Sequence, residues 1–128
     1  MKKAIIILAF AVALFNCNEN HQRETKIVSP EEMQTLLQIE NVQLVDVRTP
    51  NEFKEGHINN AQNIDFLSPT FSEDIKELDK SKPIIVYCKS GGRSAKCSKK
   101  LIEAGFEKVY DLQGGFSKWK HKGFEIEF

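Results

Sequence analysis

The chain has 128 residues with 18 basic and 18 acidic side chains, so its formal net charge is zero. This length is enough for one domain with a hydrophobic core and leaves no room for a second. The charge balance excludes the strongly basic surface that nucleic-acid binding requires. The three cysteines and three histidines lack metal-ligand spacing. We therefore expect a monomeric domain without a nucleic-acid partner, a metal ion or a cofactor.

The N-terminus has the pattern of an export signal. A short basic start at 1–3 precedes an apolar run at 4–15 that is too short to span a bilayer comfortably as a helix. Cys17 and a polar stretch follow, which resembles a bacterial lipoprotein signal. We expect residues 1–16 to be a signal peptide, lipidated Cys17 to hold the protein at a membrane of the periplasm or cell envelope, and 17–26 to be a tether. The alternatives are an uncleaved anchor, or a plain signal peptide that leaves Cys17 free.

Two patterns mark helix starts early in the remaining chain. Ser29 and Thr49 are each followed by a proline and, three positions on, by Glu32 or Glu52, which is the pattern of a capping box. Short apolar runs rich in β-branched residues predict strands between the helices. The expected strands are 27–28, 43–47, 83–87 and 108–112, with extended segments at 57–58 and 61–64. The expected helices are 29–40, 49–56, 72–78, 95–104 and 116–120.

The alternation of strands and helices determines the expected fold class. A strand, a helix and a parallel strand in succession place helices on both faces of a sheet. We therefore expect residues 27–128 to form an α/β domain of three layers, with a central, mostly parallel sheet of about five strands. Ligands of such sheets bind beyond the carboxyl ends of the strands.

The segment 88–94 follows one of these strand ends and has the composition of a reactive-cysteine loop. Glycines let the backbone take positive φ and turn successive N–H groups inward, where they bind an anion. The following helix adds unpaired N–H donors at its N-terminus, and Lys89 and Arg93 add positive charge. A thiol in this position is expected to have a lowered pKa and to be a nucleophile for an anionic substrate.

A buried structural cysteine is the ordinary alternative, but it needs neither the glycines nor the basic residues nor the helix start. We predict that Cys88 is the catalytic residue. The predicted substrate-binding residues are Lys89, Ser90, Gly91, Gly92 and Arg93.

Other residues with chemical potential have plainer interpretations. We predict that Asp46 and Arg48 form a structural polar pair, and the alternative is that they bind the substrate directly. We predict that His57 is a hydrogen-bonded structural histidine and not a catalytic base, since a thiolate held by N–H groups needs no base. Cys97 shares the inward stripe of its helix with Leu101, so we expect a core thiol and not a redox partner of the loop cysteine.

Three motifs in order along the chain resemble those of the rhodaneses, a family of sulfurtransferases. The resemblance runs from about residue 27 to 123. The first motif comprises Asp46-Val47-Arg48, Glu52-Phe53, Gly56-His57-Ile58, Ala61 and Asn63, the second is the 88–94 loop, and the third is Gly114-Gly115-Phe116-Ser117-Lys118-Trp119. The resemblance implies a single-domain rhodanese fold and a sulfurtransferase activity.

The resemblance also implies a mechanism. The Cys88 thiolate takes the outer sulfur of a small anionic donor such as thiosulfate, sulfite leaves, and loop N–H groups stabilise the resulting persulfide. Cyanide or a thiol, which could belong to a partner protein, then removes the sulfur.

Two other functions remain open from the sequence. A phosphatase or arsenate reductase of the same fold would need five residues between the cysteine and the arginine, whereas four separate Cys88 from Arg93. The shorter loop suits a sulfur atom better than a phosphoryl group. The second alternative is a non-enzymatic module, which either relays sulfur received from a partner protein or binds a partner without turnover.

Overall fold

The structure is a computed structural model that describes residues 23–39 and 41–128. The expected signal peptide at 1–16 and the expected lipid attachment site at Cys17 lie outside the described residues. Within the described ranges, no helix has both the length and the apolar character needed to cross a membrane.

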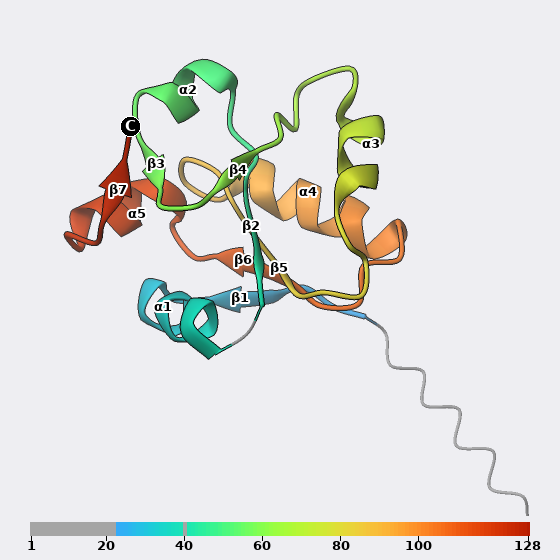
Figure 1. Ribbon diagram of the computed structural model, residues 1–128, viewed down its shortest axis with the longest axis horizontal. Coiled ribbons are helices and arrows are strands. Elements are labelled where there is room, and N and C mark those ends of the chain that lie inside the picture. Colours follow the sequence, from blue (N-terminus) through green and yellow to red (C-terminus); the bar gives the residue numbers. More distant parts are fainter. Residues whose placement is uncertain (1–22, 40) are drawn as a thin grey trace, which may run out of the picture.

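The described residues form short strands that alternate with helices (Figure 1). The strands are β1 (Lys26–Val28), β2 (Gln43–Asp46), β3 (His57–Ile58), β4 (Gln62–Asn63), β5 (Ile84–Tyr87), β6 (Val109–Leu112) and β7 (Ile126–Glu127). The helices are α1 (Pro30–Ile39), α2 (Pro50–Lys54), α3 (Phe71–Asp74), α4 (Gly92–Glu103) and α5 (Gly115–His121), with a 3-10 turn η1 (Ile75–Glu77) after α3.

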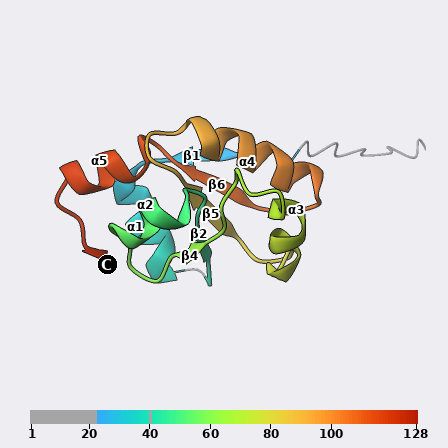
Figure 2. The ribbon, with the colours of Figure 1, turned by 90° about the horizontal axis from the view of Figure 1, so that it is seen from above.

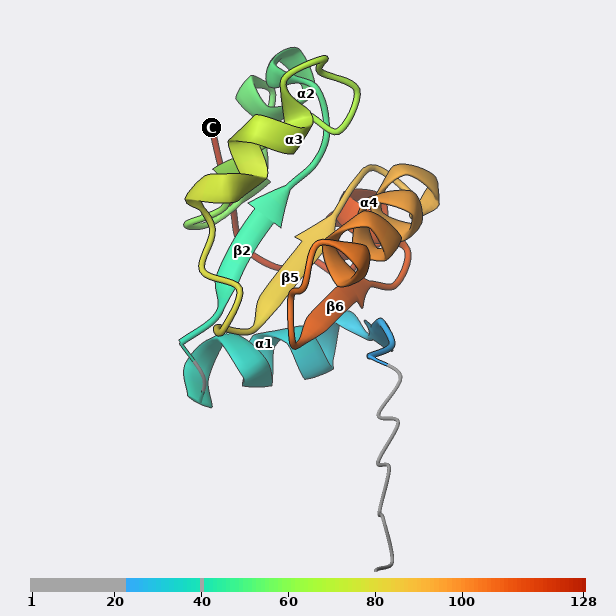
Figure 3. The same cartoon turned by 90° about the vertical axis from the view of Figure 1, so that its right-hand side faces the viewer.

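The central sheet has five strands in the order β1-β6-β5-β2-β4, and every neighbouring pair is parallel. Figure 3 shows β2, β5 and β6 side by side with their arrowheads at one edge of the sheet. The predicted α/β class and the predicted sheet of about five strands are therefore confirmed. The parallel arrangement brings the ends of β2 and β5, and the segments that follow them, to the same edge.

Helices cover both faces of this sheet, as the three-layer prediction requires (Figure 2). One core cluster packs α4 and the α3 region against the sheet, through residues that include Cys97, Leu101 and Phe71. The other packs α1 and α5 against the opposite face, through Met33 and Trp119 among others. β5 is buried along its whole length because both clusters contact it.

Both predicted capping boxes are present. The Glu32 N–H donates to Ser29 Oγ at 3.1 Å, and the Ser29 N–H donates back to the Glu32 carboxylate at 3.3 Å. Thr49 and Glu52 make the equivalent reciprocal pair at the start of α2. These caps satisfy N–H groups that have no partner within the helix, so the two helix starts could be located from local sequence.

Most element bounds differ from the prediction by one or two residues, and the expected helix 72–78 divides into α3 and the 3-10 turn η1. Two further features differ more. α4 begins at Gly92 and not at residue 95, because Gly91, with φ of 128°, turns the chain directly into the helix. The C-terminal β7 was not predicted, and it pairs antiparallel with β3 in a separate two-stranded sheet. A strand of two residues has too little alternation to be recognised in a sequence.

Gly115, at the start of α5, packs directly against the loop that follows β5. Its φ is +59°, and an added Cβ would lie 2.6 Å from the Cys88 carbonyl oxygen and 2.7 Å from the Lys89 carbonyl. Gly123 also has a positive φ, of +78°, but a Cβ there would meet nothing within 4 Å. Comparing substitutions at Gly115 and Gly123 therefore separates two free-energy costs of an added Cβ: the left-handed backbone conformation, which both positions have, and the close approach, which only Gly115 has.

We predict that Gly115→Ala destabilises the protein far more than Gly123→Ala. Gly123→Ala is expected to cost about 1 kcal/mol for the left-handed conformation. Gly115→Ala is expected to cost about 3 kcal/mol or more, because overpacking adds to that strain. Urea unfolding of the full-length variants measures both values, and equal costs would contradict the close approach.

Candidate active site

Cys88 directly follows β5, where the sheet ends and the loop to α4 begins. Its side chain is buried, with 1% of the residue exposed. The Gly91 N–H donates to the Cys88 sulfur at 3.1 Å, so the loop backbone turns back onto the sulfur. This is the inward-facing N–H arrangement that the glycines of the sequence indicated.

Ser94, in the first turn of α4, completes the surroundings of the sulfur. Its Oγ lies 3.5 Å from the Cys88 Sγ, and its hydroxyl donates to the Gly91 carbonyl oxygen at 3.2 Å. The hydroxyl can therefore accept from the thiol or, after rotation, donate to the thiolate. The sequence prediction left Ser94 out of the site. Its position six residues after Cys88, one turn into the helix, was the available signal.

The hydrogen bonds around the Cys88 sulfur set the pKa of its thiol. Burial alone raises that pKa. Hydrogen bonds from the Ser94 side chain and from the backbone N–H groups of Ser94, Gly91 and Ser90 lower it, and the net result is a pKa below the ordinary value for cysteine. The loop backbone and Ser94 thus supply the stabilisation of the thiolate that the sequence partly attributed to charged side chains.

The predicted substrate-binding residues lie in different surroundings. Ser90 and Gly91 present their N–H groups to the sulfur, and Gly92 begins α4. Arg93 makes a two-pronged ion pair with Glu52 of α2, with Nη–Oε distances of 2.6 and 3.0 Å. The Lys89 side chain makes no hydrogen bond or ion pair to any described residue and lines a pocket beside the loop.

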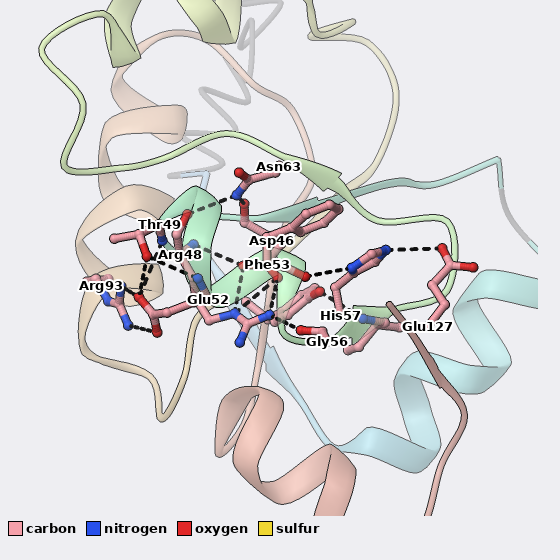
Figure 4. A network of polar contacts seen from close by, with 12 residues as sticks. Asp46, Arg48, Thr49, Glu52, Phe53, Gly56, His57, Asn63, Arg93 and Glu127 are labelled. Carbon is pink, nitrogen blue, oxygen red and sulfur yellow. Dashed lines mark hydrogen bonds and ion pairs between the residues drawn. The ribbon is translucent and has the colours of Figure 1, made fainter.

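The Arg93–Glu52 pair ties α4 to α2. The Arg93 guanidinium and the Thr49 capping groups hold the pKa of Glu52 at about 2, against a smaller opposing effect of burial. Figure 4 shows Glu52 between Thr49 and Arg93. Because the pair is bidentate, it holds the first turn of α4 against α2.

Asp46 and Arg48 form the predicted structural pair at the end of β2 (Figure 4). The Arg48 guanidinium donates to both carboxylate oxygens of Asp46, at 2.7–3.1 Å, and to the Gly56 carbonyl oxygen at 2.7 Å. Both side chains are buried, and the guanidinium lies 4.2 Å from the centre of the Phe116 ring. Arg48 thereby connects β2, the end of α2 and α5, and one edge of it reaches the pocket.

His57 is a hydrogen-bonded histidine, as predicted. Its Nδ1 lies 2.8 Å from the Phe53 carbonyl oxygen, and its Nε2 lies 3.3 Å from the Glu127 carboxylate of β7. The imidazole also stacks on the Phe53 ring with centroids 3.7 Å apart. These contacts join the C-terminal strand to α2, so the histidine serves the structure.

Cys97 is a core residue, as predicted. It is 1% exposed and packs in the cluster between α4 and the sheet. Burial raises the pKa of its thiol to about 12, with a smaller contribution from the neighbouring Asp111 carboxylate. A thiol with this pKa is inert near neutral pH, and the structure has both Cys88 and Cys97 as free thiols.

Asp111 is a buried acid that the sequence prediction did not single out. It lies on β6, is 7% exposed, and its Oδ1 has no hydrogen-bond partner among the described residues. Burial raises the pKa of this carboxyl group, and the Ser94 side chain partly offsets that effect. An acid within a strand otherwise rich in apolar residues was the sequence signal for it.

A pocket lies between α2, the Cys88 loop and α5, with a volume of about 550 Å³. It is lined by Arg48, Glu52, Glu55, Lys89, Phe116, Ser117, Lys120 and His121. The pocket shares Lys89 with the loop and is bounded by residues that follow β2, β5 and β6, at the sheet edge where ligands of parallel sheets bind. In the part of the chain that the structure describes, no group of three or more potential ligand side chains could hold a metal ion.

The profile of the rhodanese-like domain family matches residues 29–122. The chain therefore belongs to the rhodanese-like domain family, as its three motifs indicated. The chain resembles the structure of a rhodanese-related protein of Thermoplasma volcanium, with a TM-score of 0.71 and 26% identity over 80% of this chain and 97% of that one. It also resembles a rhodanese-like domain protein of Staphylococcus aureus, with a TM-score of 0.68 and 31% identity over 81% of this chain and 100% of that one.

Similar sequences include proteins with and without a named activity. The uncharacterized protein YqhL of Bacillus subtilis is 35% identical over 92% of this chain and 90% of its own length. Thiosulfate sulfurtransferase 16 of Arabidopsis thaliana, a chloroplastic protein, is 40% identical over 62% of this chain and 74% of its own length. Thiosulfate sulfurtransferase GlpE of Shewanella oneidensis is 35% identical over 73% of this chain and 91% of its own length.

We predict that the two cysteines of the folded domain differ sharply in reactivity. Because its pKa is lowered, Cys88 should react with iodoacetamide at a rate that levels off at lower pH than the rate of an unperturbed cysteine does. Cys97 should stay unmodified at pH 7, because its pKa is about 12. Peptide mass mapping after timed labelling of the wild type and of Cys88→Ser measures this. Comparable labelling of both thiols at pH 7 would overturn the assignment.

Proposed function

We propose that this protein is a sulfurtransferase that moves a sulfane sulfur from a donor such as thiosulfate to a thiophilic acceptor through a persulfide on Cys88. The observation that carries the proposal is the Cys88 sulfur at the end of β5, with the Gly91 N–H directed at it and Ser94 beside it. Membership of the rhodanese-like family and the names of the two sulfurtransferase relatives support it.

The first half-reaction forms the persulfide. The Cys88 thiolate attacks the outer sulfur of thiosulfate, the sulfur–sulfur bond of the donor breaks, and sulfite leaves with the electron pair. The lowered pKa of Cys88 supports this step because the thiolate is the attacking form. The outer sulfur of the persulfide is anionic and would lie within reach of the loop N–H groups from Lys89 to Arg93.

The second half-reaction regenerates the thiolate. An acceptor, either cyanide or a thiol, attacks the outer sulfur of the persulfide, and the electron pair of the broken bond returns to the Cys88 sulfur. The protein is unchanged after the two steps, and the first product leaves before the acceptor reacts. Ping-pong kinetics are therefore expected.

A phosphatase or arsenate reductase is the less favoured activity. Four residues separate Cys88 from Arg93, and the Arg93 guanidinium is engaged by Glu52 on both of its terminal nitrogens. An arginine held in this way has fewer donors left for the oxygens of a phosphoryl group.

Intact mass spectrometry tests the sulfurtransferase proposal. After incubation with thiosulfate, we expect the full-length protein and Cys97→Ser to gain the mass of one sulfur atom, and we expect that gain to disappear when cyanide is added. Cys88→Ser should gain nothing, because it lacks the nucleophile. Cys97→Ser is the matched control, since it removes a thiol that the structure places in the core.

Each other outcome has a distinct meaning. A gain in mass for Cys88→Ser equal to that of the wild type would exclude Cys88 as the carrier. No gain in any variant would contradict thiosulfate as donor and favour a module that receives its sulfur from a partner protein. Hydrolysis of a phosphate ester under the same conditions would contradict the loop-length argument.

We further propose that the protein is exported and held at a membrane by lipid on Cys17. Support for this comes from the sequence: a basic start at 1–3, the apolar run at 4–15 and the cysteine directly before a polar stretch. Such attachment would place the domain in the periplasm or cell envelope, where a second exported protein could accept its sulfur.

Fractionation of bacteria that produce the full-length chain tests this location. We expect the wild type in the membrane fraction, with lipid on an N-terminal Cys17 detected by mass spectrometry. Cys17→Ser should lose the lipid, while Asn20→Ser, a substitution nearby that keeps the cysteine, should remain lipidated. A soluble wild type, or a membrane-bound one whose residues 1–16 remain attached, would refute the lipoprotein interpretation.

A further inference from the structure

Asp111 of β6 is a buried carboxyl group without a counter-charge. It is 7% exposed, and its Oδ1 has no hydrogen-bond partner among the described residues. Its neighbours in register are the apolar Ile27 of β1 and Val86 of β5. Burial raises its pKa, and no cation is among the groups that oppose the rise. A carboxylate in these surroundings would lose its hydration without compensation, so the neutral acid is the favoured form.

The Asp111 side chain lies on the face of the sheet that α4 covers. Side chains two positions apart in a strand point to the same face. Val109, two positions before Asp111, belongs to the core cluster that contains Cys88 and Cys97. Ser94, in the first turn of α4, is buried over the same face. The acid and the reactive sulfur thus lie under one helix.

Ser94 connects the acid to the sulfur. Its Oγ lies 3.5 Å from the Cys88 Sγ, and its side chain lowers the pKa of both Cys88 and Asp111. A hydroxyl lowers the pKa of an acid by donating its proton to the charged form. Ser94 has only one hydroxyl proton, so it cannot serve a thiolate and a carboxylate fully at the same time.

We propose that Asp111 is a positioning residue for the Cys88 thiolate: as a neutral acid it donates its O–H to the Ser94 oxygen, and the Ser94 hydroxyl proton is then directed to the Cys88 sulfur. An ionised Asp111 would instead accept that proton and place a second negative charge near the sulfur, and both effects would disfavour the thiolate. The inference deepens the proposed sulfurtransferase function and rests on it, because the thiolate is the form that attacks the donor.

Other titratable groups around this chain of contacts keep their charge state near neutral pH. Cys97 of α4 is influenced by Asp111, and its pKa of about 12 keeps it neutral. Two cations also face the chain from α4: Lys100 acts on Cys97, and Arg93 interacts with the charged Cys88 sulfur. Lysine and arginine side chains stay charged near neutral pH. A change in the Cys88 profile on replacing Asp111 therefore reports on the acid itself.

The pH profile of Cys88 alkylation by iodoacetamide tests this role in the full-length protein. We expect Asp111→Asn to keep the wild-type profile, because an amide can also donate to Ser94. Asp111→Leu has a side chain of similar length without a donor. Its profile should move to higher pH, with the acid dissociation constant of the thiol about fivefold smaller, as the loss of one hydrogen bond predicts.

Two results of that experiment would overturn the proposal. A profile that Asp111→Asn moves to lower pH would show that the wild-type acid is ionised and opposes the thiolate. A wild-type profile in Asp111→Leu would show that the acid does not act on the sulfur.

Stability separates a positioning role from a packing role. A buried carboxyl group without full hydrogen bonding opposes folding, so Asp111→Leu should unfold at the same urea concentration as the wild type or at a higher one. Loss of Cys88 reactivity together with a loss of stability would assign the acid to packing and overturn the proposal.

A double-mutant cycle tests whether the effect passes through Ser94. In the background of Ser94→Ala, which lacks the hydroxyl, Asp111→Leu should cause no further change in the Cys88 profile. Ser98→Ala is the matched control, because the Ser98 hydroxyl donates to the Ser94 carbonyl oxygen at 2.8 Å and not to the sulfur. Asp111→Leu should keep its fivefold effect in that background. Equal effects in both backgrounds would contradict the route through Ser94.

Persulfide formation from thiosulfate distinguishes failure of this inference from failure of the proposed function. If no persulfide forms on the wild type while the alkylation profiles change as expected, the role of Asp111 stands and the sulfurtransferase function is contradicted. If the persulfide forms and the alkylation profile is the same in the wild type, Asp111→Asn and Asp111→Leu, the role of Asp111 alone is overturned.

Discussion

The hydrogen bonds between the start of α5 and the Cys88 loop are the constraint on which the site depends. Loop N–H groups face the sulfur, so the carbonyl oxygens of Cys88 and Lys89 face away from it and need donors. The first N–H groups of a helix have no partner within the helix, and those of Phe116 and Ser117 fill this need. The contact is close enough that only a glycine fits at position 115.

A second set of contacts fixes the opposite wall of the site. Arg48 is buried with its guanidinium on Asp46 and on the Gly56 carbonyl oxygen, and its outer face lies on the Phe116 ring. A buried arginine with all of this polar and aromatic support is held in one orientation. Strand β2, the end of α2 and helix α5 are therefore positioned together, and the pocket beside the loop is bounded by a rigid wall.

The electrostatics of the site are divided between short-range and longer-range groups. Hydrogen bonds from the loop backbone and Ser94 overcome the cost of burying a charged sulfur, which lowers the pKa of Cys88. Arg93 forms an ion pair with Glu52, so its guanidinium holds α4 against α2. Lys89 and Lys120 lie farther out, where they line the pocket beside the loop, and their side chains have no hydrogen-bond or ion-pair partner among the described residues.

The sequence by itself determined the features that depend on local chemistry: the capping boxes, the buried strand 84–87, the parallel α/β class, the cysteine loop and the family. The tertiary structure decided which side chains meet. Folding brings together Arg93 and Glu52, and it pairs β3 with β7. Folding also places Ser94 beside the Cys88 sulfur and buries Asp111. Local patterns report hydrogen bonds within a few residues of the chain, whereas contacts across 41 positions, as between Arg93 and Glu52, depend on how the layers pack.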